Sequence, residues 1–224
     1  MESQALIDLK NITFSYPHGQ KVLADFNFRF EANQKTGLIG ANGCGKTTLL
    51  YLIMGLLQPQ AGEVEIFGEA RKTKKDFQAV RPQIGFVFQD ANDQLFCPTV
   101  ADDLAFGPLN LGLDRRQAEK IVQETLALLG LEGFERRVTY DLSAGEKKLV
   151  SIGTALALRP KLLILDEPTT CLDTETVARL EKVLERCDLP YLIVSHDHDF
   201  LAKVTDSQWV LTGGRNHGES STDK

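Results

Sequence analysis

A glycine-rich segment in the first quarter of the chain constrains the structure more than any other feature. It runs from Gly40 to Thr48, reads G-A-N-G-C-G-K-T-T and matches the pattern G-x-x-x-x-G-K-[ST]. The apolar residues before it and the helix-forming residues after it predict a strand, a turn and the start of a helix. Glycines let the backbone curl into a nest of N–H donors, and a helix N-terminus adds positive potential. The segment is therefore expected to bind phosphate groups.

The side chains of this segment divide the expected phosphate chemistry. Lys46 supplies a point charge for the β- and γ-phosphates of a nucleotide, and the hydroxyl of Thr47 can coordinate Mg²⁺. The alternative is a glycine-rich turn with a chance lysine, and the flanking strand and helix argue against it. The expected nucleotide-binding residues of the segment are Gly40, Ala41, Asn42, Gly43, Cys44, Gly45, Lys46, Thr47 and Thr48.

Length and composition limit the remaining possibilities. The 224 residues can bury a sizeable core, as one domain with an inserted subdomain. The 25 basic and 31 acidic residues give a net charge of −6, which argues against a general polyanion-binding surface. There is no run of about 18 apolar residues and no signal-peptide pattern, so a soluble, cytoplasmic chain is expected. The four cysteines are far apart and form no C-x-x-C pair, so neither a zinc site nor a disulfide framework is indicated.

The N-terminal part of the chain has the pattern of strands. Residues 5–14 and 22–30 are apolar and β-branched or aromatic, and turn-forming residues separate them, so two strands joined by a turn are predicted. Tyr16 follows the first strand and could stack on a purine ring, whereas packing alone is the alternative for a turn tyrosine. The basic residues 71–75 are interpreted as a solvated loop rather than a nucleic-acid contact.

Polar residues follow three apolar runs that are predicted to be strands. Ligands of α/β proteins bind at the carboxyl ends of such strands. Asp166 is expected to hold Mg²⁺, and Glu167 to orient and polarise the attacking water. Gln89 is a candidate for touching Mg²⁺ or that water, and His196 for sensing a γ-phosphate. An ordinary surface glutamine and a structural histidine are the alternatives. The runs cover residues 84–88, 162–165 and 191–194.

Residues 90–145 interrupt the alternation of strands and helices with a helical block that has the character of an insertion. Thr99 is expected to cap its first helix, and Gly107-Pro108 to end that helix. A second helix is predicted over residues 115–129. The predicted organisation is a single domain, with a core over residues 1–89 and 146–212, the insertion over 90–145 and a polar tail over 213–224.

A second candidate anion site lies at Ser143, Ala144 and Gly145. A serine hydroxyl, small residues and the start of a helix over residues 147–158 can together bind a phosphate. The alternative is a plain helix N-cap in which Glu146 closes a capping box, and it is favoured when the segment is taken alone. Farther on, a helix over residues 175–186 and a last strand near 208–212 are predicted.

Taken jointly, these motifs resemble the ATPase subunits of ATP-binding-cassette (ABC) proteins, and the resemblance covers residues 5–212. Three short motifs are similar in sequence to those of the energy-coupling-factor type, in which cobalt/nickel and vitamin importers are found. They are F-Q-D at 88–90, D-Q-L-F at 93–96 and F-G-P-L-N-L-G-L at 106–113. The resemblance implies an α/β P-loop NTPase core with a mixed sheet, an N-terminal antiparallel β region and an inserted α-helical subdomain. The motifs occur in the order phosphate loop, Gln89, Ser143-Ala144-Gly145, Asp166-Glu167, Asp173 and His196.

The resemblance also implies roles for these residues. Tyr16 would stack on adenine, Glu167 would be the general base and His196 the switch. Gln89 would be the lid glutamine. Because the family closes two ATP molecules between two head-to-tail chains, Ser143, Ala144 and Gly145 would contact the nucleotide of a second subunit. Asp173 would communicate across that dimer.

The implied function is that of an ATP-hydrolysing motor subunit of an importer, with ATP and Mg²⁺, at the cytoplasmic face of the cell membrane. Its implied partners are a second ATPase chain, identical or different, a transmembrane coupling component and a membrane protein that binds the cargo. Residues 93–113 would face the membrane partner. Cobalt or nickel is the first choice of cargo, with biotin or another vitamin next. A soluble ABC ATPase acting on nucleic acid or ribosomes and an exporter motor are the alternatives.

Four positions depart from the family pattern. Ala144 stands where glycine is usual, which is expected to loosen a phosphate contact slightly, and Glu146 stands where glutamine is common. Leu149 stands where an arginine is often found, so an ion pair made by that arginine is not expected here. Cys44 replaces a serine, and its oxidation is expected to block phosphate binding by bulk and charge. The sequence also ends soon after the last predicted strand, whereas many members of the family carry a further C-terminal domain. Without such a domain, dimerisation is expected to depend more on ATP.

Overall fold

The computed structural model describes residues 5–17, 19 and 21–212, so the predicted tail over 213–224 lies outside the described residues. The described chain packs into two compact units. The first unit contains the residues up to Arg81, Pro190–His196 and the residues from Thr205 on, and the second contains Pro82–Leu189 and Asp197–Val204. The elements are β1 Ala5–Ser15, β2 Lys21–Glu31, β3 Lys35–Ile39, α1 Lys46–Ile53, β4 Ala61–Ile66, β5 Glu69–Ala70, α2 Lys74–Val80, η1 Arg81–Gln83, β6 Ile84–Val87, η2 Ala91–Asp93, α3 Val100–Asn110, α4 Arg115–Leu129, η3 Thr139–Asp141, α5 Ala144–Ala157, β7 Leu162–Asp166, α6 Thr174–Arg186, β8 Tyr191–Val194, α7 His198–Val204 and β9 Ser207–Val210.

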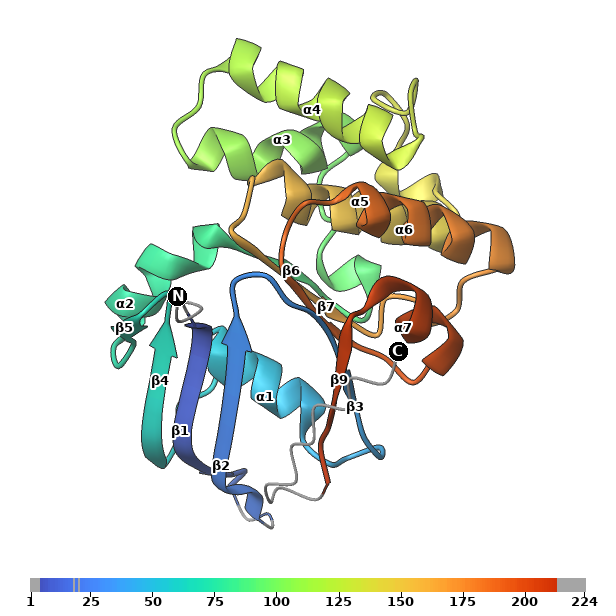
Figure 1. Cartoon of the computed structure of the whole chain (residues 1–224). Coiled ribbons are helices and arrows are strands. Elements are labelled where there is room, and N and C mark those ends of the chain that lie inside the picture. The colour runs from blue at the N-terminus through green and yellow to red at the C-terminus, as the bar shows by residue number, and fades with distance from the viewer. Residues whose placement is uncertain (1–4, 18, 20, 213–224) are drawn as a thin grey trace. The chain divides into compact units, whose positions relative to one another are not determined.

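An antiparallel sheet in the order β2-β1-β4-β5 forms one part of the first unit (Figure 1). In β1 and β2, residues on one face alternate with exposed or half-buried ones, and Leu9 pairs with Phe28 across the strands. Both side chains are at most 2% exposed. This alternation is the pattern of a strand with one buried face, and it confirms the two strands predicted at the N-terminus.

Parallel strands form the other part of the first unit. β3 lies between β8 and β9 and pairs with both in parallel. All four residues of β8 are buried, as expected for a strand that is covered on both faces. The chain leaves β3 at Ile39, passes through the glycine-rich segment and enters α1, which confirms the predicted order of strand, turn and helix.

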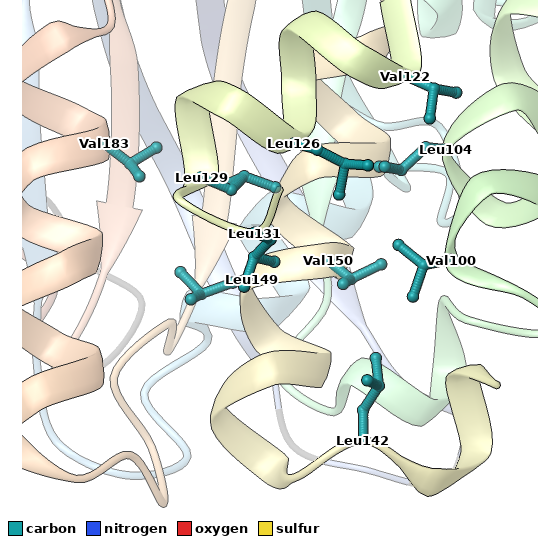
Figure 2. Close-up of a cluster of buried hydrophobic side chains, with 10 residues drawn as sticks. All are labelled: Val100, Leu104, Val122, Leu126, Leu129, Leu131, Leu142, Leu149, Val150 and Val183. Carbon is teal, nitrogen blue, oxygen red and sulfur yellow. The ribbon is translucent and has the colours of Figure 1, made fainter. Parts of the chain in front are cut away.

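The second unit combines two parallel strands with a group of helices. β6 pairs with β7 in parallel, and α3 and α4 pack against each other and against α5. Figure 2 shows the hydrophobic cluster that fills the space among these helices and α6. The cluster comprises Val100, Leu104, Val122, Leu126, Leu129, Leu131, Leu142, Leu149, Val150 and Val183.

Leu149 belongs to this cluster and is 1% exposed. The position where the family has an arginine is therefore an apolar contact in this chain. A charged side chain there would lose its hydration in an apolar cluster, so the leucine is matched by its surroundings.

Truncating the cluster is expected to destabilise the second unit. Leu126 is fully buried, and replacing it with alanine removes apolar contacts and leaves a cavity. The expected loss in the free energy of unfolding for Leu126→Ala is about 2–5 kcal/mol, measured by urea denaturation. Leu111→Ala is the matched control, because Leu111 is 45% exposed, and its free energy of unfolding should change by less than about 0.5 kcal/mol. Equal values for the two variants would contradict the packing shown in Figure 2.

Two details of the predicted secondary structure are wrong. Gly107-Pro108 does not end α3, because the helix continues to Asn110 with Pro108 inside it. A residue before proline is normally kept out of the helical conformation by its Cβ, and Gly107 has none. A Cβ at Gly107 would also lie 2.5 Å from Leu158 Cδ2, so the glycine serves packing as well.

The second error concerns the basic residues 71–75, which are not wholly a solvated loop. Helix α2 begins at Lys74, after Thr73. The side chain of Thr73 accepts a hydrogen bond from the Asp76 N–H, and Asp76 accepts one from the Thr73 N–H at 2.7 Å. This capping box is written in the sequence as Thr73 followed three residues later by an acidic residue. Arg71 also ion-pairs with Glu69 and hydrogen-bonds the carbonyl of Ile66.

Within the residues that the structure describes, no helix has both the length and the apolar character needed to cross a membrane.

Candidate nucleotide-binding site

The glycine-rich segment forms the connection from β3 to the N-terminus of α1. Gly45 is the N-cap of α1 with φ 108°, in the left-handed region that favours glycine. A Cβ at this position would lie 2.9 Å from Val22 Cγ1. The backbone angle and the close contact both require glycine, so the chain can present its N–H groups around the helix N-terminus, where anions are stabilised.

Lys46 lies within this loop with 7% of its surface exposed. Its Nζ donates to the carbonyl oxygens of Gly40 at 2.7 Å and Ala41 at 3.2 Å. The same Nζ is 3.2 Å from His196 Nε2. An ammonium group has only donors, so the ring nitrogen of His196 is the acceptor in this hydrogen bond. The structure thus brings together Lys46 and His196, which are 150 residues apart in the sequence.

The other residues of the loop differ in their exposure. The exposed residues can contact a ligand without rearrangement, whereas the buried residues hold the loop in its conformation. Thr47, the candidate Mg²⁺ ligand, is exposed and Cys44 is 9% exposed. The exposed residues are Ala41, Asn42, Gly43 and Thr47, and the buried ones are Cys44, Gly45, Lys46 and Thr48.

Tyr16 contacts this loop through its hydroxyl group, which lies 3.1 Å from Thr48 Oγ1. Its ring packs edge-on against Phe14 at 5.0 Å between centroids. Tyr16 nevertheless stays 43% exposed. Packing therefore accounts for part of the ring, and stacking on adenine stays a prediction for the exposed part.

Asp166 and Glu167 lie at the end of β7 in the second unit. Asp166 is the last residue of the strand and is 3% exposed, and Glu167 follows it with φ 45°. A left-handed conformation is strained for a residue with a side chain and is found most often at functional sites. The left-handed backbone at Glu167 is compatible with a functional site, and its role as the general base stays a prediction.

Ser143 is the N-cap of α5, so the favoured interpretation of this segment is confirmed. Its Oγ accepts from the Glu146 N–H at 3.2 Å, and its own N–H donates to Glu146 Oε2 at 2.8 Å. This backbone hydrogen bond and, less strongly, the ion pair with Arg137 hold the pKa of Glu146 below its usual value. The helix begins at Ala144, three residues before the predicted start. Whether the same N-terminus also binds a phosphate stays a prediction.

Gly145 and Asp173 share one neighbour, Thr176. A Cβ at Gly145 would lie 2.7 Å from Thr176 Oγ1, so α5 can approach α6 this closely only with glycine at this position. Asp173 caps α6 by accepting from Thr176 N at 2.8 Å and from Thr176 Oγ1 at 3.0 Å. These hydrogen bonds lower the pKa of Asp173. The structure therefore brings together Gly145, from the second candidate anion site, and Asp173, the residue predicted to communicate across the dimer.

Gln89 follows β6 and borders a groove of about 490 Å³ in the second unit. Ala144, Lys148, Thr170 and Cys171 also line this groove. Gln89 and Ala144 of the second candidate anion site, separated by more than fifty residues of sequence, thus line one groove of this unit.

Sequence reasoning assigned no role to Lys148 and placed Gln94 on a surface that faces a partner. Lys148 is 3% exposed, and this burial lowers the pKa of its ammonium group, while Asp90 and Asp166 favour its charged form. Gln94 turns inward and donates to α5 through its amide. A signal existed for Lys148, because it lies on the buried face of α5 between Gly145 and Ile152. No local pattern distinguishes Gln94.

Comparisons with known proteins identify relatives among ABC transporter proteins. A family model described as ABC transporter matches residues 23–170. The chain is 48% identical over 210 residues to a putative ABC transporter ATP-binding protein of Nitratidesulfovibrio vulgaris, covering 93% of this chain and 77% of the relative. It is 42% identical over 213 residues to the energy-coupling factor transporter ATP-binding protein EcfA of Methanothermobacter thermautotrophicus, covering 93% of this chain and 68% of that protein.

Solved structures share the fold. The cbiO1 protein of Clostridium perfringens, described as part of the ABC transporter complex cbiONQ, matches with a TM-score of 0.88 and 31% identity over 98% of this chain and 89% of its own. A dimeric ATP-binding cassette in a post-hydrolysis state, bound to ADP and Pi, matches with a TM-score of 0.86 and 25% identity over 96% of this chain and 98% of its own. These likenesses confirm the predicted fold class.

Proposed function

The chain belongs to the ATP-hydrolysing subunits of ABC transporters, and we propose that it is the motor of an importer of the energy-coupling-factor type. The observation that carries the nucleotide chemistry is the position of Lys46, held by carbonyl oxygens inside a loop that opens α1. A lysine placed this way at a helix N-terminus is suited to the charge of a nucleotide's phosphates. The importer type rests on the likeness to EcfA.

Each step of the proposed hydrolysis uses a side chain of this sequence. Lys46 and the loop N–H groups bind the β- and γ-phosphates, and Tyr16 stacks on adenine. Thr47, Asp166 and Gln89 offer a hydroxyl, a carboxylate and an amide oxygen, the hard oxygen donors that Mg²⁺ prefers. When bound, Mg²⁺ supplies charge that neutralises the phosphate oxygens.

Three residues are proposed to act at the γ-phosphate and on the water molecule that attacks it. Glu167 accepts the proton of this water and orients it. His196 registers the γ-phosphate, with a ring nitrogen already within 3.2 Å of the phosphate-binding Lys46. Gln89, the candidate for touching Mg²⁺ or the attacking water, is the third residue.

A second copy or a related chain completes the proposed motor. Ser143 and Ala144 are exposed at the N-terminus of α5, where a helix can receive a phosphate from another molecule. In this proposal Ser143, Ala144 and Gly145 contact the nucleotide of the partner chain, and Asp173 communicates between the chains. The structural relative bound to ADP and Pi is described as dimeric, which supports the proposal of a two-chain motor.

Large exposed apolar side chains of the second unit form the proposed surface for a membrane component. The rings of Phe96 and Phe106 pack edge-on at 4.8 Å, yet these residues are 66% and 48% exposed. A groove of about 630 Å³ lies nearby along α3 and α4 and includes Ala105 and Leu109. Such exposed apolar groups mark interaction surfaces. The exposed apolar residues are Phe96, Phe106, Leu109, Leu111, Val138 and Tyr140.

Placing a charge on this surface should break the complex. Phe96→Glu is expected to weaken binding of the membrane component by about 30-fold or more, the effect of losing an aromatic hot spot worth about 2 kcal/mol. The measurement is the amount of membrane component recovered with a tagged chain from detergent extracts. Leu56→Glu is the control, because Leu56 is 49% exposed but belongs to the first unit. Equal recovery with both variants would remove the surface around Phe96 from this role.

Cobalt or nickel is the proposed cargo, and biotin or another vitamin is the alternative. This choice rests on the resemblance of residues 142–148 and of the helical insertion to metal importers. The likeness to cbiO1, part of the ABC transporter complex cbiONQ, supports the transporter type and not the cargo. In the proposal the cargo is bound by a membrane protein, so no residue of this chain contacts it. Uptake of radiolabelled cobalt, nickel and biotin by cells with and without this chain distinguishes the two: loss of metal uptake alone supports the choice, and loss of biotin uptake alone overturns it.

A further inference from the structure

Two polar side chains, the buried Lys148 and the half-buried Gln94, join α5 to the segment that follows β6, and the proposed hydrolysis uses neither of them. The first is Lys148, whose Nζ donates to the carbonyl oxygen of Gln89 at 2.6 Å and to that of Phe88 at 3.2 Å. Because Lys148 is 3% exposed, water competes little for its ammonium group. A hydrogen bond from a charged donor in such surroundings is stronger than a neutral one.

The second side chain is Gln94, which lies beyond η2 but points back to α5. Its Nε2 donates to Ser151 O at 2.8 Å and to Thr154 Oγ1 at 2.7 Å. Its Oε1 accepts from the Phe88 N–H at 3.1 Å. The amide thus uses both its donors on α5 and its acceptor on the residue next to Gln89.

Charged groups around Lys148 connect this arrangement to the catalytic residues. Asp90 and Asp166 both act on its ammonium group. The backbone carbonyl of Gln89 is therefore held by the ammonium group of Lys148. The carboxylate of Asp166, which is proposed to hold Mg²⁺, favours the charged form of that group.

We propose that Lys148 and Gln94 are positioning residues that fasten Gln89 to α5, so that Gln89 and the Ser143–Gly145 end of the helix move as one body. This inference rests on the proposed ATPase function. It predicts that a nucleotide contact at Ser143 in one chain sets the position of Gln89 in the same chain. Neither residue touches ATP, and both act through Gln89.

Lys148→Met tests this link, because methionine keeps much of the length of the side chain and removes its donors. The expected result is a kcat for ATP hydrolysis about 10- to 100-fold lower, since misplacing a catalytic group by about 1 Å can cost that much. The KM for ATP should change by less than about threefold, because the phosphate-binding loop with Lys46 belongs to the other unit. Lys148→Gln retains a donor and should recover part of the lost kcat. Lys120→Met is the control on the exposed side of α4 and should match the wild type.

A double-mutant cycle separates positioning from general destabilisation. If Lys148 acts through Gln89, then adding Lys148→Met to Gln89→Ala should lower kcat by less than about twofold further, since coupled sites are not additive. Full additivity of the two losses would overturn the proposal. ATP-binding stoichiometry and the thermal midpoint of each variant show whether a loss of kcat reflects loss of folded protein.

Hydrogen exchange supplies a measurement that does not depend on ATPase activity. In Lys148→Met and in Gln94→Leu, the amides of residues 88–91 should exchange faster than in the wild type, because the bonds that hold this segment are gone. Unchanged exchange in both variants would overturn the link itself. A wild-type chain without ATPase activity would instead overturn the proposed function, and the exchange result would still stand.

Discussion

Replacing Glu167 with glutamine should leave ATP binding at the wild-type level and reduce hydrolysis at least about 100-fold, since a positioned general base contributes about 10²–10⁴ in rate. Glutamine has the shape of glutamate but no carboxylate that could accept the proton of the attacking water. The backbone at this position is left-handed, with φ 45°, directly after the buried Asp166. Because glutamine matches glutamate in shape, the substitution removes the proton acceptor and keeps the shape of the side chain.

Two measurements on the same preparation check this result. Phosphate release gives the turnover, and fluorescent-nucleotide titration gives the affinity for ATP. Because ATP stays intact in the variant, light scattering should also show an ATP-dependent dimer that persists longer than that of the wild type. Glu175→Gln is the control, since Glu175 lies in the first turn of α6 and pairs with Arg179 at the surface. Near-normal turnover by Glu167→Gln would remove Glu167 from its role.

Replacing Lys46 with alanine should have the opposite signature, a loss of nucleotide binding itself. Hydrogen bonds to charged groups contribute about 1.5–3 kcal/mol each, and Lys46 is proposed to contact two phosphates. We therefore expect an affinity for ATP that is about 100-fold lower or worse. The carbonyl oxygens of Gly40 and Ala41 would also lose their donor, so the loop should become less ordered.

Calorimetric titration with ATP in the presence of Mg²⁺ measures this affinity directly. Lys75→Ala serves as the matched control, because Lys75 is exposed on α2 and lies outside the loop. Wild-type affinity in Lys46→Ala would show that the loop does not bind the phosphates through this side chain. Together, the two variants separate binding, which depends on Lys46, from turnover, which depends on Glu167.

The parts of the structure that sequence alone could predict are those set by local patterns. The glycine-rich segment carries its own strand and helix as flanks, and the buried strands β7 and β8 are continuous apolar runs. The N-cap role of Ser143 follows from the spacing to Glu146. In each case the residues that decide the structure are within a few positions of one another.

The parts that could not be predicted depend on contacts between distant segments. The place of Lys148 on the buried face of α5 can be predicted from the sequence, but its partners, Phe88 and Gln89, some sixty residues earlier, cannot. Pro108 looks like a helix breaker until the missing Cβ of Gly107 is considered together with the packing of Leu158. The pairing of Lys46 with His196 joins positions 150 residues apart. These features depend on tertiary packing, which the conformational preferences of short segments do not predict.

We propose that this ATPase drives import through separate membrane proteins. The most direct test is mass spectrometry of the proteins that co-purify with the chain after mild extraction of native membranes in the presence of ATP. We expect a small multi-span cargo-binding protein together with a second membrane protein that serves as the coupling component. Recovery of the chain alone, or with ribosomes or DNA in the soluble fraction, would contradict the transport assignment and leave only the ATPase chemistry.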